Sequence, residues 1–123
     1  MEKSKVMEIA TTIRKQLMCT TDPNVLFSWG LQGFIATTFN KMDTLKFKVN
    51  GRLFKGYVLI CYNTLDYYEI YLSDEKETRC ICDMAYSDNF GEIIDTAIES
   101  GTDPEEYNKF CKAERAKLFS GHF

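Results

Sequence analysis

The segment from Leu45 to Tyr62 limits the possible folds of this chain more than any other. Three apolar residues alternate there with three polar ones: Leu45, Phe47 and Val49 with Lys46, Lys48 and Asn50. A period of two with one polar face is typical of a half-exposed β-strand. Asn50-Gly51 then predicts a type I′ hairpin turn, which needs positive φ at both central residues. The returning strand covers Leu53–Tyr62, and its Gly56 indicates a bulge or a bend.

The run Tyr57–Tyr62 is apolar on both faces, which predicts a strand in the middle of the sheet. Further runs of strand-forming residues lie at Phe34–Phe39, Tyr67–Leu72 and Arg79–Ala85. Short polar turns separate them, Asn63–Asp66 and Ser73–Thr78. Consecutive strands with short turns make an antiparallel meander, here of four or five strands.

Helical periodicity surrounds this block. Residues 3–18 carry an apolar stripe of Val6, Ile9, Ala10, Ile13 and Leu17. Asp22-Pro23 predicts a cap and a short helical turn over Pro23–Trp29 that Gly30 ends, with Trp29 as a core residue.

Two more helices are predicted after the strands. The first carries a stripe from Phe90 to Ile98, with Ser87 or Asp88 as its cap and Gly101 as its stop. The second begins at Asp103-Pro104-Glu105-Glu106 and runs to about Phe119. The sequence therefore predicts one two-layer α+β domain over residues 1–123, an antiparallel four- or five-stranded meander with the N-terminal helix and two C-terminal helices packed on one face.

The size and the apolar runs predict where this chain works. With 123 residues it is long enough for one domain with its own core. No apolar run approaches the ~20 residues of a membrane span, and no secretory signal is recognisable. We expect a cytoplasmic protein without membrane contact. The five cysteines are then expected to be free core thiols, with Cys80 and Cys82 on the same face of one strand.

No residue of this sequence is marked for common catalytic chemistry, and a lysine or cysteine nucleophile stays open. The single histidine, His122, lies at the C-terminus, where nothing would hold its geometry. The sequence contains no phosphate-binding glycine loop and no zinc-binding pattern. We expect no catalytic, cofactor-binding or metal-binding residues, and an enzyme with an unrecognised pocket is only a third hypothesis.

Charge is unevenly distributed along the chain. Residues 41–65 hold five Lys or Arg against one Asp, a net charge of +4, whereas residues 66–106 hold thirteen acids against two basic residues, or −11. In one interpretation the basic and acidic strands are neighbours and their exposed faces pair across the sheet. In the other, Lys46, Lys48 and Arg52 of the hairpin 41–56 form a basic patch for nucleic acid. The overall charge of −3 favours the first.

Tyrosines are the most suggestive candidates for a contact surface. After Asp66, Tyr67, Glu69 and Tyr71 share one face of a predicted strand, an amphipathic set on the open side of the sheet. In the simpler interpretation Tyr67 and Tyr71 only cover the outer face of the sheet.

Five stretches carry a resemblance to known proteins: Phe27–Gly30, Leu45–Gly51, Lys55–Val58, Asp66–Leu72 and Ile93–Asp95. Together they resemble a family of small uncharacterised α+β proteins that gut bacteria encode, often on mobile elements. The family has no assigned activity, so the resemblance implies a bacterial or phage cytoplasmic setting and no site.

The combined expectation is a non-catalytic protein-interaction module of a bacterial or mobile-element system. Its partner would be a protein, either another chain or a second copy, bound through Tyr67, Glu69 and Tyr71 or through a sheet edge. The alternative is a nucleic-acid-binding accessory protein that uses Lys46, Lys48 and Arg52.

Overall fold

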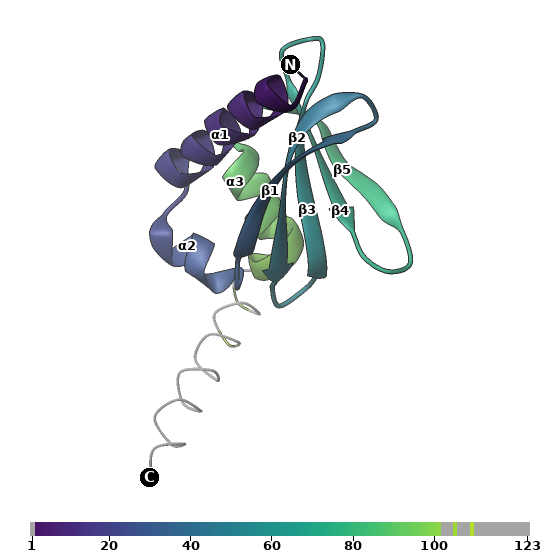
Figure 1. Cartoon of the computed structure of the whole chain (residues 1–123). Coiled ribbons are helices and arrows are strands. Elements are labelled where there is room, and N and C mark those ends of the chain that lie inside the picture. The colour runs from purple at the N-terminus through teal and green to yellow at the C-terminus, as the bar shows by residue number, and fades with distance from the viewer. Residues whose placement is uncertain (1, 102–104, 106–108, 110–123) are drawn as a thin grey trace.

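The computed structural model describes residues 2–101, 105 and 109 of the chain. Its elements are α1 (Glu2–Thr20), α2 (Pro23–Ser28), β1 (Gln32–Phe39), β2 (Met42–Asn50), β3 (Lys55–Tyr62), β4 (Tyr68–Ser73), β5 (Thr78–Ala85), α3 (Phe90–Asp95) and the π-helix η1 (Thr96–Ser100). Figure 1 shows the helices α1 and α3 on one side of a curved sheet. The α+β class is confirmed, while the predicted helix 103–119 lies outside the described residues except for residues 105 and 109.

The five strands form one antiparallel sheet in the order β1-β2-β3-β4-β5. This is the expected meander, and β3, the strand that is apolar on both faces, lies in its centre as predicted. The β2–β3 register sets Phe47 opposite Val58 and Leu45 opposite Ile60. Because side chains alternate along each strand, one face of the sheet collects these apolar residues.

The core lies between that face and the helices. It contains Ala10, Ile13 and Leu17 of α1, Leu45, Phe47 and Val49 of β2, Val58 and Ile60 of β3, Ile70 and Leu72 of β4, and Phe90, Ile94 and Ile98 after the sheet. The helical stripes read from the sequence are therefore the buried stripes. None of the helices in the described ranges is both long and apolar enough to cross a membrane.

Trp29 anchors α2 to the rest of the domain, as the sequence predicts. The Asp22 side chain caps α2 by accepting the Asn24 N–H at 2.8 Å, and Pro23 begins the helix. The indole of Trp29 is fully buried, stacks on Phe47 with ring centroids 6.4 Å apart, and donates from Nε1 to Asp95 Oδ1 at 2.9 Å. A buried indole N–H needs such an acceptor.

The predicted type I′ turn at Asn50-Gly51 is wrong. Asn50 still pairs with Lys55, so the connection has four residues, and neither Asn50 nor Gly51 has positive φ. Gly51 is required for a different reason: a Cβ at this position would lie 2.3 Å from the Ile98 carbonyl oxygen of η1. Leu53 N–H donates to that same oxygen at 2.7 Å. The turn is shaped by its contact with the π-helix.

The turn with positive φ lies one hairpin earlier, at Asn40 and Lys41. Their φ angles are 49° and 65°, and Phe39 pairs with Met42 around them. Two consecutive residues in the left-handed region are the mark of a two-residue type I′ turn. The sequence signal was weak because lysine, unlike glycine, does not favour positive φ.

The helix after the sheet differs from the prediction in its cap and in its last turn. Asn89, and neither Ser87 nor Asp88, occupies the cap position, and its side chain makes no capping hydrogen bond. It accepts instead from the backbone N–H of Tyr86 at 2.8 Å. The last turn widens into the π-helix η1, which the periodicity did not indicate. Gly101, with φ of 70°, ends it as expected.

Candidate functional site

The face of the sheet opposite α1 and α3 is called the open face here. The register places Ile35, Lys46, Leu59, Tyr71 and Cys80 side by side across it, one from each strand. The next row holds Lys48, Tyr57, Ser73 and Thr78. Both predicted sets of site residues therefore contribute to the same face.

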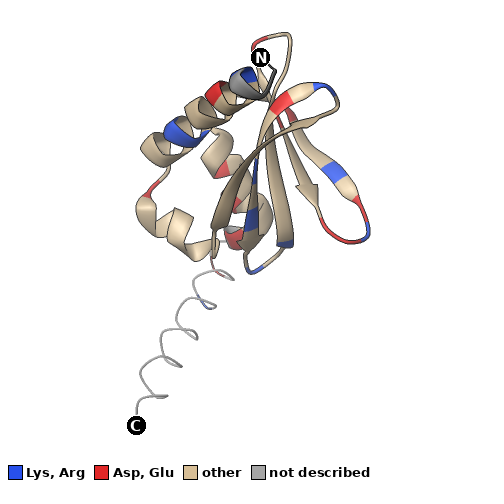
Figure 2. Ribbon diagram, in the orientation of Figure 1, with Lys and Arg blue, Asp and Glu red and all other residues tan. Residues whose placement is uncertain are grey.

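The basic hairpin lies beside the acidic strands as expected, because β3 pairs with β4, but the predicted pairing of their exposed charges is wrong for the lysines of the hairpin. β3 separates β2 from β4, so Lys46 faces Leu59, and Lys48 faces Tyr57. Within the described ranges, Lys46, Lys48 and Lys55 form no ion pair. Figure 2 shows basic residues along β2 and both acidic and basic residues on the β4–β5 hairpin.

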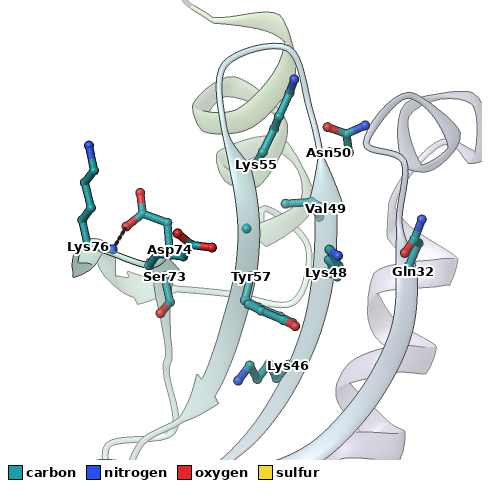
Figure 3. A pocket seen from close by; sticks show the side chains of 12 residues that line it. Gln32, Lys46, Lys48, Val49, Asn50, Lys55, Tyr57, Ser73, Asp74 and Lys76 are labelled. Atoms are coloured by element: carbon teal, nitrogen blue, oxygen red, sulfur yellow. Dashed lines mark hydrogen bonds between the residues drawn. The ribbon is translucent and has the colours of Figure 1, made fainter.

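The half of the open face that lies toward the β2–β3 turn is hollowed into a groove of about 890 Å³. Its lining comes from β1 to β4 and the β4–β5 turn: Gln32, Lys46, Lys48, Val49, Asn50, Lys55, Gly56, Tyr57, Ser73, Asp74, Glu75 and Lys76. Figure 3 shows the Tyr57 ring beside Lys46 and Lys48, with Asp74 on the opposite wall. This volume is within the range of ligand-binding sites.

The two walls of the groove carry opposite charge. On the wall of β2 and β3, Lys46 Nζ lies 4.4 Å from the Tyr57 ring centroid, a cation–π contact. On the other wall, Asp74 accepts the backbone N–H groups of Lys76 and Glu77 at 2.8 and 2.9 Å. These hydrogen bonds lower the pKa of the Asp74 carboxyl below its usual value. The wall of β2 and β3 thus offers three lysine ammonium groups, and the opposite wall offers Asp74 and Glu75 together with Lys76.

The other half of the open face, toward the β1–β2 turn, is covered by aromatic rings. The rings of Phe39 and Tyr71 meet with centroids 4.8 Å apart, so the end of β1 reaches across the sheet to β4. Thr44 and Cys61 below them are fully buried. Burial raises the pKa of the Cys61 thiol to about 11, so it is protonated at neutral pH.

The tyrosine set is partly buried and internally bonded. Tyr71 donates its hydroxyl to Glu69 Oε1 at 2.7 Å, and Glu69 Oε2 accepts from Asn63 Nδ2 at 3.2 Å. The hydrogen bond to Glu69 raises the pKa of Tyr71. Tyr67 lies just before β4 and packs edge-on against Tyr86, centroids 5.4 Å apart. Only Tyr71 stands in the row that contains Lys46.

The basic set is divided. Lys46 and Lys48 line the groove together, as expected, and they are joined there by Lys55, which the sequence placed in the same hairpin. Arg52 lies against η1, where its Nε donates to the Glu99 carbonyl oxygen at 2.9 Å and its backbone N–H to Glu99 Oε2 at 2.6 Å. Arg52 therefore helps to fix the β2–β3 turn.

The cysteines do not follow the expectation of a shared face. The β4–β5 register shifts at Ile81, so Cys80 lies opposite Tyr71 on the open face, while Cys82 lies opposite Ile70 and packs on the core. Cys19 and Cys80 are exposed, so the expectation of core thiols is wrong for them. The part of the chain that the structure describes holds no group of three or more His, Cys, Asp or Glu suited to a metal.

Comparisons with known proteins add no assignment. No model of a protein family, no curated protein and no solved structure matches this chain. The resemblance to a gut-bacterial family stays a prediction, and the functional argument depends on the groove.

Proposed function

We propose that this domain is a non-catalytic protein-interaction module whose open-face groove binds an acidic segment of a partner protein. The observation that carries the proposal is the set of three lysines, Lys46, Lys48 and Lys55, which line one groove without an acidic partner in the described chain. Carboxylates of a bound segment would pair with these lysines and be partly shielded from water by the walls of the groove.

The opposite wall favours a polypeptide over nucleic acid. Asp74 and Glu75 line the groove together with the lysines, and a phosphate backbone would meet their negative charge. A peptide can carry acidic residues toward β2 and a basic residue toward the β4–β5 turn. Tyr57 supplies an aromatic surface between the two, of the kind enriched in interfaces.

The first experiment is an affinity capture from the source cells with three forms of the protein. The test variant carries Lys46→Glu with Lys48→Glu. The matched control carries Lys5→Glu with Lys15→Glu, which changes the net charge equally on the exposed surface of α1. We expect the wild type and the control to retain a stoichiometric protein partner after nuclease treatment, and the test variant to lose it. Circular dichroism would verify that each variant is folded.

Quantitative binding to the identified partner segment then measures the charge dependence. Neutralising the same two lysines with Lys46→Gln and Lys48→Gln should weaken binding by about tenfold, at roughly 0.2–1 kcal/mol for each exposed ion pair. Retention of the partner by the Lys46→Glu, Lys48→Glu variant would refute the groove as its site. Material that disappears with nuclease would favour the nucleic-acid alternative.

A further inference from the structure

The edge strand β1 is a second candidate surface, and it shares only Gln32 with the groove. β1 is an edge strand that pairs only with β2 in the described part of the chain. Its eight residues, Gln32–Phe39, contain no charge and no proline. Edge strands usually carry such residues, because unpaired backbone groups otherwise recruit another strand.

The turn geometry identifies the unpaired backbone groups. Phe39 and Met42 close the two-residue turn, so they form a hydrogen-bonded pair, and bonded and non-bonded pairs alternate from there. The N–H and C=O groups of Phe34, Ala36 and Thr38 consequently point away from β2.

We propose that two copies of this chain associate by antiparallel pairing of their β1 strands about a two-fold axis at Ala36. In this register Ala36 lies opposite Ala36 of the second copy, and Phe34 lies opposite Thr38 of the second copy, twice by symmetry. Each of these pairs exchanges two backbone hydrogen bonds. Ile35, half-exposed in one chain, is then covered by Thr37 of the second copy.

Charge complementarity selects a second copy as the occupant. The Arg14 guanidinium lies 4.7 Å from the Phe34 ring centroid, and Asp43 lies opposite Thr38 in the β1–β2 register. Pairing Phe34 with Thr38 of the second copy therefore brings Arg14 of each copy toward Asp43 of the other. Neither residue has an ion-pair partner among the residues that the structure describes. Within one chain, Arg14 and Asp43 lie beside Phe34 and Thr38 respectively. These two residues are four positions apart, about 13 Å along the strand.

The same register covers apolar surface beside β1. Phe27 is 88% exposed at the rim of a hollow of about 540 Å³ that Met18, Leu31 and Phe34 also line. The turn residues 40 and 41 of the second copy would lie beyond Phe34, at the irregularity between Gln32 and Phe34 and next to this hollow. Met18 and Phe27 are both exposed beside this hollow, and contiguous exposed apolar surface is typical of an interaction site.

Sedimentation equilibrium from micromolar to near-millimolar concentration tests the proposal. We expect a reversible monomer–dimer equilibrium. Arg14→Glu alone and Asp43→Lys alone should each weaken the dimer at least about tenfold, because two attractive contacts become repulsive by symmetry. The double variant Arg14→Glu, Asp43→Lys should return to within about threefold of the wild type, as a swapped pair restores the attraction. Thr38→Lys, which faces Arg14 of the second copy, is an independent disruptive variant.

Amide hydrogen exchange by NMR locates the contact. Raising the protein concentration should protect the amides of Phe34, Ala36 and Thr38, and leave those of Ile35 and Thr37 unchanged because β2 already holds them. A protein that stays monomeric throughout would overturn the proposal. So would a dimer that tolerates both charge reversals, or one that the double variant fails to restore. The groove variant Lys46→Glu, Lys48→Glu should dimerise normally, so the two proposals fail independently.

Discussion

Gly51→Ala gives the sharpest test of how the β2–β3 turn is built. The added Cβ would lie 2.3 Å from the Ile98 carbonyl oxygen and 3.0 Å from its carbon, so the turn must withdraw from η1. Withdrawal breaks the hydrogen bond from Leu53 N–H to Ile98 and the one from Arg52 N–H to Glu99. The first contributes about 1 kcal/mol and the second, to a buried carboxylate, about 2 kcal/mol, so the free energy of unfolding should fall by about 3 kcal/mol.

Gly33 provides the matched control. Its φ is +54° and a Cβ there would meet nothing within 4 Å, so Gly33→Ala should cost only the left-handed backbone, about 1–2 kcal/mol. Asparagine tolerates that conformation better than alanine, so Gly33→Asn should be the milder change there. At Gly51, where space is the constraint, Gly51→Asn should be at least as destabilising as Gly51→Ala.

Urea unfolding, followed by the fluorescence of the single tryptophan and by circular dichroism, measures both pairs. The reasoning would be refuted if Gly51→Ala cost less than about 1 kcal/mol, a value below the sum of the two hydrogen bonds. A Gly51→Asn variant more stable than Gly51→Ala would also refute it, since that order belongs to a turn with positive φ.

The other predictions concern Trp29 and Cys61. Trp29→Phe removes the hydrogen bond to Asp95 and part of the ring stacked on Phe47, and should lower the free energy of unfolding by about 3 kcal/mol. Urea unfolding followed by circular dichroism measures this change. An unchanged unfolding midpoint would contradict the anchoring role of Trp29. Because burial raises the pKa of Cys61 from 9.0 to about 11, the protonated thiol stabilises the fold fully below pH 9 and this contribution is lost as the pH rises through 11. The free energy of unfolding should therefore fall more steeply between these pH values for the wild type than for Cys61→Ala, and equal slopes would exclude the effect. Iodoacetamide at pH 8, read by peptide mass spectrometry, should label Cys80 in the native protein and Cys61 only in denaturant.

Local periodicity was enough to predict the elements of this fold, because burial repeats every two or 3.6 residues along a single segment. The alternation of Leu45, Phe47 and Val49 and the stripe at Ile13 and Leu17 are both buried as expected. The details that failed depend on contacts between distant segments. Gly51 is held by Ile98 rather than by its own turn, and the shift at Ile81 separates Cys80 from Cys82.

The candidate site could be predicted only in part, because it also depends on contacts between distant segments. Lys46 and Lys48 could be placed on one strand face from their spacing, but only the sheet order reveals that Tyr57 and not an acid stands opposite Lys48. Asp74 joins the groove through the β4–β5 turn, which no local pattern connects to β2. Arg52 does not line the groove, because the turn that carries it is hydrogen-bonded to Glu99.

The β2–β3 turn also has a thermodynamic consequence. Its flanking residues Asn50 and Lys55 are part of the groove wall, while Arg52 and Leu53 between them are bonded to η1. Any ligand that displaces this turn changes the free energy of the π-helix, and any change at the π-helix alters ligand affinity by the same factor. A ligand that moves the turn would therefore be thermodynamically linked to the π-helix that ends at Gly101.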